Sequence, residues 1–244
     1  MTALEARTKL NSMASTAVAA TSSRFFKTGP GQYGEGDVFV GVRVPVLRNL
    51  AREFRSLPLS EIDVLLCSAI HEERLLAILI LTQSLVRCDA DHRKQVYEFY
   101  MSRKAHVNNW DLVDTSAPAI VGGYFADKPR KPLIKIAKST SLWERRIAIV
   151  ATQHFIRMGQ FDDTLSISLV LLSDGEDLIH KAVGWMLREV GERDETPLVQ
   201  FLDKHADAMP RTMLRYAIEH FSAERRKAYL AMRNRSTDQT THAK

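Results

Sequence analysis

Residues 177–194 read DLIHKAVGWMLREVGERD, and their pattern is the clearest indication of the fold class. Its apolar residues recur at the spacing of an α-helix, and the small residue Ala182 lies among them. One helix pair earlier, WERRIAIVATQHFIRMG (143–159) has the same helical pattern around Ala148. One pair later, PRTMLRYAIEHF (210–221) has it around Ala217. The pattern indicates one structural unit that recurs along the chain.

The recurrence extends toward the N-terminus at a regular period. Small or β-branched markers in successive helix pairs are Ala77, Val113, Ala148, Ala182 and Ala217, with spacings of 36, 35, 34 and 35 residues. Such a period is typical of helical solenoids, in which each pair buries its apolar face against its neighbours. We therefore predict an all-α, HEAT-like helical-repeat solenoid (an α-α superhelix) with a concave binding face.

The helices are separated by short breaks. These are expected at Gly122-Gly123, Gly159, Asp174-Gly175, Gly191 and Pro210. Ser60 is expected to cap a helix, residues 1–23 to form one amphipathic first helix, and DVFVGVRV (37–44) to form an extended loop. We predict a single repeat domain over residues 1–232 and a disordered tail over 233–244.

Composition excludes several classes of protein. The chain has 244 residues, 45% of them hydrophobic and 26% charged, which is globular rather than disordered. The formal net charge of +5 permits a nucleic-acid partner without demanding one. The two cysteines, Cys67 and Cys88, lack zinc-site spacing and fit a reducing cytoplasm. TGPGQYGEGD (28–37) lacks the phosphate-loop pattern, so neither a nucleotide cofactor nor a metal is expected.

A row of basic residues lies in register with the repeat. Arg146, Lys181 and Arg215 each lie one or two residues before a marker, so they are expected to recur along the concave face. A DNA backbone requires such a spaced row of cations. The alternative is that they are solvated helix residues with partners four residues away. The sequence favours neither reading over the other.

Two tryptophans and one carboxylate could carry chemistry. Trp110 and Asp114 are four residues apart and share one helix face, whereas Asp111 points elsewhere. Trp185 follows Trp110 by 75 residues, close to two periods. The alternative is that each tryptophan packs in the core and that Asp114 pairs with an arginine.

The neighbours of Trp185 add positive charge. Lys181 precedes it by four residues and Arg188 follows it by three, so all three share a helix face. Indole faces attract a cation, a carboxylate stabilises a positively charged sugar or orients a water, and basic residues hold phosphates. An N-alkylated purine in DNA suits all three groups. Its positive charge also makes it a good leaving group.

Four stretches resemble a known family. VNNWDLVD (107–114), SLWERRIAI (141–149) and DLIHKAVGWMLREVG (177–191) are similar to signature segments of the AlkD-type DNA alkylation-repair glycosylases. FVGVRVPVLRNLA (39–51) resembles that family's F-x-G-[IV]-x-x-P-x-x-R pattern. The resemblance extends from about Phe25 to about Phe221.

The resemblance implies a HEAT-like fold that cradles duplex DNA and acts in base excision repair. Such enzymes release 3-methyladenine and 7-methylguanine by cleaving the N-glycosidic bond without base flipping, and no lyase step is expected. Asp114 matches the catalytic carboxylate, and Trp110 and Trp185 match the aromatic residues that contact the deoxyribose. Arg146 matches the phosphate-contacting arginine. Lys181 and Arg188 lie in a family segment, so their roles transfer less directly.

The chain departs from the family pattern at two places. Asn109 stands where the family often has a tryptophan, and Phe25 or Phe26 stands where a lesion-approaching tyrosine is often found. We expect a monomer in the cytoplasm, associated with the nucleoid in a bacterium. Two alternatives are a non-catalytic module that binds distorted or branched DNA, and a protein-binding solenoid anchored by Trp110 and Trp185.

Overall fold

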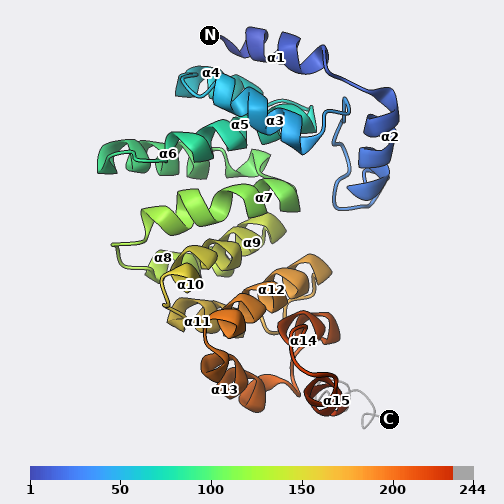
Figure 1. The fold of residues 1–244 in the computed structure, drawn as a ribbon, viewed down its shortest axis with the longest axis vertical. Helices are drawn as coiled ribbons and strands as arrows, with labels where there is room; N and C mark the ends of the chain where they lie inside the picture. Colours follow the sequence, from blue (N-terminus) through green and yellow to red (C-terminus); the bar gives the residue numbers. More distant parts are fainter. Residues whose placement is uncertain (233–244) are drawn as a thin grey trace. The chain divides into compact units, whose positions relative to one another are not determined.

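A computed structural model describes residues 1–232, which form helices joined mostly by short turns, with one longer non-helical segment over residues 26–43 (Figure 1). The only β-structure in this part of the chain is an isolated parallel bridge between Val38 and Ile70. The chain is thus an all-α helical-repeat protein, as the period predicted. The predicted tail, 233–244, lies outside the described residues. No helix within 1–232 has the length and apolar character needed to cross a membrane.

Where the sequence predicted one domain, the described residues divide into two compact units, which are treated separately below. The first is Met1–Tyr124, and the second begins at Phe125. The helices of the first unit are α1 (Ala3–Asn11), α2 (Thr16–Phe25), α3 (Val44–Glu53), α4 (Leu59–Leu66), α5 (His71–Ser84), α6 (Ala90–Ser102), η1 (Lys104–His106), α7 (Trp110–Ala117) and the π-helix η2 (Pro118–Gly122).

Helix α5 is the core of the first unit. Every residue from His71 to Leu81 is buried, because α3, α4 and α7 all pack against this helix (Figure 1). The markers Ala77 and Val113 are both 0% exposed. A helix that is apolar all round requires such enclosure, which explains the run LLAILIL at 75–81.

The second unit is organised around α12. Its helices are α8 (Lys131–Ala137), α9 (Leu142–Ala151), α10 (Gln153–Arg157), α11 (Asp162–Val170), α12 (Asp177–Arg193), α13 (Glu195–His205), α14 (Arg211–Ala217) and α15 (Ala223–Ala231). Helix α12 packs against α9, α13 and α14. The markers Ala148, Ala182 and Ala217 are at most 1% exposed, so the small residues lie where helices meet. The repeat assignment is thereby confirmed in this unit as in the first.

The glycines of α12 allow close helix packing. A Cβ at Gly184 would lie 2.5 Å from the Met213 carbonyl oxygen and 2.5 Å from the Tyr216 Cβ on α14. Gly191 was predicted to break the helix, and that prediction is wrong, because α12 continues to Arg193. A side chain at 191 would overlap Leu198 of α13, so the glycine serves packing rather than termination.

Two further breaks differ from prediction. The N-terminal stretch forms two helices rather than one, because the Ser15 side chain accepts a hydrogen bond from Val18 N and caps a new helix there. Gly122-Gly123 does not end α7, since Pro118 leads directly into a π-helical turn. The breaks at Gly159, Asp174-Gly175 and Pro210 are confirmed.

Ser60 was also assigned wrongly as a cap. Helix α4 begins at Leu59 after Pro58, whose carbonyl oxygen accepts hydrogen bonds from Glu61 N and Ile62 N. The chain therefore enters the helix before Ser60. The extended loop predicted over residues 37–44 is confirmed. The segment is non-helical as far as Arg43, and its only β-structure is the bridge at Val38.

Candidate functional site

Helix α7 presents Trp110 in its first turn because Asn109 fixes where the helix begins. Asn109 is 0% exposed, and its Oδ1 accepts a hydrogen bond from Trp110 N at 2.8 Å. Its Nδ2 donates to Asp37 Oδ2 at 2.9 Å. The residue at which the sequence departs from the family pattern thus anchors the helix to the loop that precedes α3.

Trp110 and Asp114 lie on α7 one turn apart, and both are partly exposed. Leu112 and Val113 on the same helix are fully buried. Burial raises the pKa of Tyr100 above its usual range, and the charge of nearby Asp114 adds to this rise. Asp114 is therefore partly exposed and lies near enough to the buried Tyr100 hydroxyl to influence its pKa.

The two N-terminal phenylalanines meet Trp110. The Phe26 ring is stacked on the indole, with centroids 5.2 Å apart and an interplanar angle of 15°. Phe25 packs its edge against the indole at 5.9 Å and is itself 63% exposed. The first unit therefore brings together Phe25, Phe26 and Trp110, which the sequence had only proposed as separate candidates.

A buried histidine, which the sequence did not single out, lies behind this cluster. His71 is 1% exposed, and its ring is 4.9 Å from Phe26 and 4.6 Å from Phe39 between centroids. Its Nδ1 is 3.0 Å from Asp37 Oδ2 and its Nε2 is 2.8 Å from Asp111 Oδ2. Asp111, which the sequence did not assign to the site, points at this histidine.

One signal in the sequence could have revealed the histidine. The residues HEER at 71–74 open a helix that is otherwise apolar, and all four are at most 4% exposed. Four consecutive polar residues at the start of a core helix need buried partners, because unpaired buried charges are costly. The spacing gave no indication of which partners these are.

The polar groups form a charge-balanced network. Burial by itself lowers the pKa of His71, but the hydrogen bonds to Asp111 and Asp37 outweigh it and raise the pKa to about 9. Burial raises the pKa of Asp37, and its bonds to His71, Arg74 and Asn109 outweigh this and lower it. Arg74 Nη2 is 2.5 Å from Asp37 Oδ1. Near neutral pH, two cations thus face two carboxylates.

Glu72 fixes the loop that carries Phe39. Its carboxylate accepts hydrogen bonds from the backbone N–H groups of residues 40, 41 and 42, at 2.8–3.3 Å. Gly41 has φ of +86°, and a Cβ there would lie 2.0 Å from the Ser15 carbonyl oxygen. The glycine in FVGV therefore allows the loop to approach α2 closely enough for Phe39 to reach Phe26.

A cavity of about 290 Å³ lies alongside the cluster. Residues from the site that line it are Phe26, Phe39, His71 and Asp111. The rest of the lining is mostly apolar, and its polar members are Ser22, Glu72 and the exposed Arg43.

In the second unit, α12 presents Trp185 between two ion-paired cations. Trp185 is partly exposed, and its Nε1 donates to Glu189 Oε1 at 2.9 Å. Lys181 Nζ lies 2.8 Å from Asp177 Oδ2. Arg188 pairs with Glu219 of α14 and lies 3.6 Å from Glu192. Lys181 and Arg188 thus each have a carboxylate four residues away on α12.

The other two predicted cations of this unit differ in environment. Arg146 is only 5% exposed, and its Nη1 donates to the Leu178 carbonyl oxygen at 2.5 Å. Arg215 lies on the exposed face of α14. Arg146 thus joins α9 to α12 inside the unit, whereas Arg215 is open to solvent.

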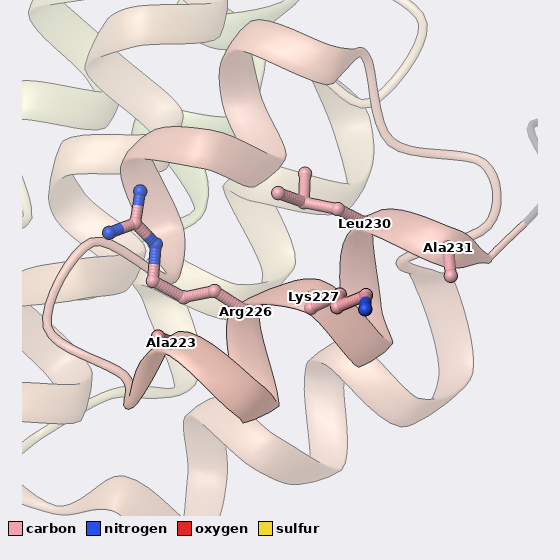
Figure 2. A pocket seen from close by; sticks show the side chains of 5 residues that line it. All are labelled: Ala223, Arg226, Lys227, Leu230 and Ala231. Carbon is pink, nitrogen blue, oxygen red and sulfur yellow. The ribbon is translucent and has the colours of Figure 1, made fainter.

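A second hollow lies along α15, away from every predicted site residue. Its volume is about 450 Å³, and it is lined by Ala223, Arg226, Lys227, Leu230 and Ala231 (Figure 2). Within residues 1–232, no group of three or more His, Cys, Asp or Glu side chains is placed to hold a metal ion.

The helical repeat, together with an aromatic and acidic face on α7, defines the class of protein. Residues 6–221 match the family model described as DNA alkylation repair enzyme, and the chain belongs to this family. A search of curated proteins gave no match. The family implies DNA as the substrate.

A solved structure has the same fold. It is described as "Predicted DNA alkylation repair enzyme from Enterococcus faecalis", with a TM-score of 0.69 and 18% sequence identity. The match covers 86% of this chain and 98% of the other. At this identity, the likeness concerns the fold alone.

Proposed function

We propose that the protein is a monofunctional DNA glycosylase that removes cationic N3- and N7-alkylated purines from duplex DNA. The observation that carries this proposal is the pairing of Trp110 and Asp114 on the exposed side of α7, with Phe26 stacked behind the indole and Phe25 exposed beside it. An aromatic face next to a carboxylate suits a cationic, planar lesion attached to a sugar.

The bond that breaks is the glycosidic bond between C1′ and the purine nitrogen. An alkylated purine carries a positive charge, so it takes up the bonding electron pair and leaves as a neutral base without being protonated. The sugar is left with oxocarbenium character, which the Asp114 carboxylate stabilises. A water oriented by Asp114 adds to C1′ and gives up its proton, which leaves an abasic site. No lysine nucleophile is needed, so the strand is not cut.

The second unit supplies groups suited to the DNA backbone. Trp185 offers a further indole face, and Lys181, Arg188 and Arg215 lie on helices α12 and α14. We propose that these residues contact deoxyribose and phosphates, that Arg146 contributes at the same surface, and that the lesion stays in the duplex without base flipping. We further propose that the protein acts as a monomer in the cytoplasm without a cofactor.

The test is release of 7-methylguanine and 3-methyladenine from methylated duplex DNA. Wild type should release free base, and Asp114→Asn should release it at least 100-fold more slowly while still binding DNA. The matched control is Asp91→Asn, which removes an exposed carboxylate from the first turn of α6. Salt-dependent DNA binding by wild type with no base release would contradict catalysis and favour the non-catalytic module.

A further inference from the structure

The first turn of α7 is tied to α5 by one side chain. Asp111 directly follows Trp110, and its Oδ1 accepts from Leu112 N at 2.9 Å while its Oδ2 faces His71 Nε2 at 2.8 Å. The carboxylate thus bonds its own helix with one oxygen and α5 with the other. A shift of His71 would move the backbone next to Trp110.

A second connection runs through the rings. Phe26, at the C-terminal end of α2, contacts His71 on one side and lies nearly parallel to Trp110 on the other. Phe39 stacks on His71 at an interplanar angle of 24° and on Phe26 at 22°. An imidazolium is attracted to both phenyl faces, which favours this arrangement over loose apolar contact.

Burying the charged groups of this network costs desolvation free energy. Apolar residues of similar volume often match or exceed a buried ion pair in stability, but they fix no direction. His71 holds carboxylates from two different elements, Asp37 from the loop before α3 and Asp111 from α7, at opposite ring nitrogens. The backbone supports this, since His71 N donates to Val38 O at 2.8 Å. The network thus gains directional bonds between three elements.

We propose that His71 is a positioning residue that fixes the Trp110 indole, through Asp111 along the backbone and through Phe26 along the rings. That Trp110 meets a damaged base rests on the proposed function. The positioning of Trp110 by His71 does not, because it concerns contacts within the first unit alone. A neutral imidazole has one N–H and can donate to only one of the two carboxylates. Loss of the proton therefore breaks one connection and releases either the loop or α7.

Several of the elements packed around His71 place charged groups near its ring. They are Asp37 from the loop, Asp111 from α7, and Arg74 from α5 itself, whose Nη2 lies 3.5 Å from His71 Nδ1. Phe26, which directly follows α2, contributes its phenyl ring, and Arg43, which directly precedes α3, lines the adjoining cavity together with Glu72 of α5.

The direct test is NMR of the full chain labelled with 5-fluorotryptophan. The Trp110 signal is assigned by its absence in Trp110→Phe, and the His71 titration is followed by its ring ¹⁵N shifts. We expect the Trp110 fluorine shift to follow the His71 titration as pH rises through about 9. In Asp111→Asn, both should move together to lower pH, since one carboxylate partner is lost.

A second variant separates the two connections. Phe26→Leu removes the ring between His71 and Trp110 but keeps both hydrogen bonds of His71. We therefore expect His71 to titrate at slightly lower pH, because one aromatic contact of the imidazolium is lost, while the Trp110 response shrinks at least twofold. The matched control is Asp63→Asn, which breaks the ion pair with Arg103 far from this cluster and should leave both titrations unchanged. A Trp110 signal that ignores the His71 titration in wild type would overturn the proposal.

Kinetics give an independent readout. Single-turnover base release at saturating DNA should fall about tenfold in Asp111→Asn and in Phe26→Leu, with unchanged affinity for undamaged duplex. A variant that lowers only the melting temperature, with a wild-type release rate, would assign His71 a purely structural role. If wild type released no base, the proposed function would fail, and the NMR coupling would still decide the positioning.

Discussion

His71 Nε2 lies 2.8 Å from Asp111 Oδ2, although 40 residues separate the two in the sequence. Asp111 is the neighbour of Trp110, and His71 is the first residue of α5. A buried ionic contact therefore lies directly behind the surface proposed to meet DNA, and we expect it to make the stability of the first unit depend on pH.

The first prediction concerns that pH sensitivity. His71 has a folded pKa of about 9 against an ordinary value of 6.5, so folding favours its protonated form. The resulting stability is fully present below pH 6.5 and is lost as pH rises through 9. We expect wild type to lose on the order of 3 kcal/mol of unfolding free energy between pH 6 and 10 from this group, measured by urea denaturation.

The control is His71→Gln, which keeps a hydrogen-bond donor without a titrating group. It should be less stable than wild type at pH 6, and the gap should narrow by pH 10. Equal pH dependence in the two proteins would contradict the assignment. A second control is His92→Gln, which changes a histidine of α6 whose ring is hydrogen-bonded to Ser84 of α5. This variant should keep the pH dependence of the wild-type unfolding free energy.

The second prediction concerns the approach of α12 to α14. Gly184→Ala places a Cβ within 2.5 Å of a backbone carbonyl oxygen, which cannot move independently of its helix. We expect a loss of about 1–3 kcal/mol in unfolding free energy. Gly191→Ala in the same helix meets the flexible end of Leu198 and should cost less. Thermal melts of both variants that ranked them in the opposite order would contradict the packing.

The third prediction concerns the exposed cation on α14. Arg215→Ala should leave the unfolding free energy within about 0.5 kcal/mol of wild type, because the side chain is exposed. If Arg215 contacts one phosphate, the slope of log Kd against log salt concentration should fall by about 0.9. Fluorescence anisotropy with a duplex oligonucleotide measures this slope. An unchanged slope would exclude Arg215 from the DNA interface.

The fourth prediction separates Arg146 from Arg215. Arg146 is 5% exposed and donates to Leu178 O, so Arg146→Ala removes a buried side chain together with this charge-assisted hydrogen bond. We expect it to lose about 2–3 kcal/mol of unfolding free energy. DNA affinity should therefore be compared at temperatures where both proteins are folded. A wild-type melting temperature for Arg146→Ala would mean that this bond adds nothing to stability.

The helical fold could be predicted because its cause is local and repeated. Ala77, Val113, Ala148, Ala182 and Ala217 recur at 34–36 residues, and all are buried in the structure. Boundaries were harder to predict, since Gly191 and Gly122 look like breaks in a single sequence. Whether a glycine ends a helix or admits a neighbour depends on what packs against it, and that neighbour is distant in the sequence.

The site shows the same division. The helical repeat and the shared face of Trp110 and Asp114 follow from the amino-acid sequence alone, because helical periodicity fixes which residues lie one turn apart. Tertiary packing was needed to stack Phe26 on Trp110, to bury Arg146 and to join Asp37 to Asp111 through His71. These contacts link residues from different elements, and no periodicity along the chain encodes such pairings.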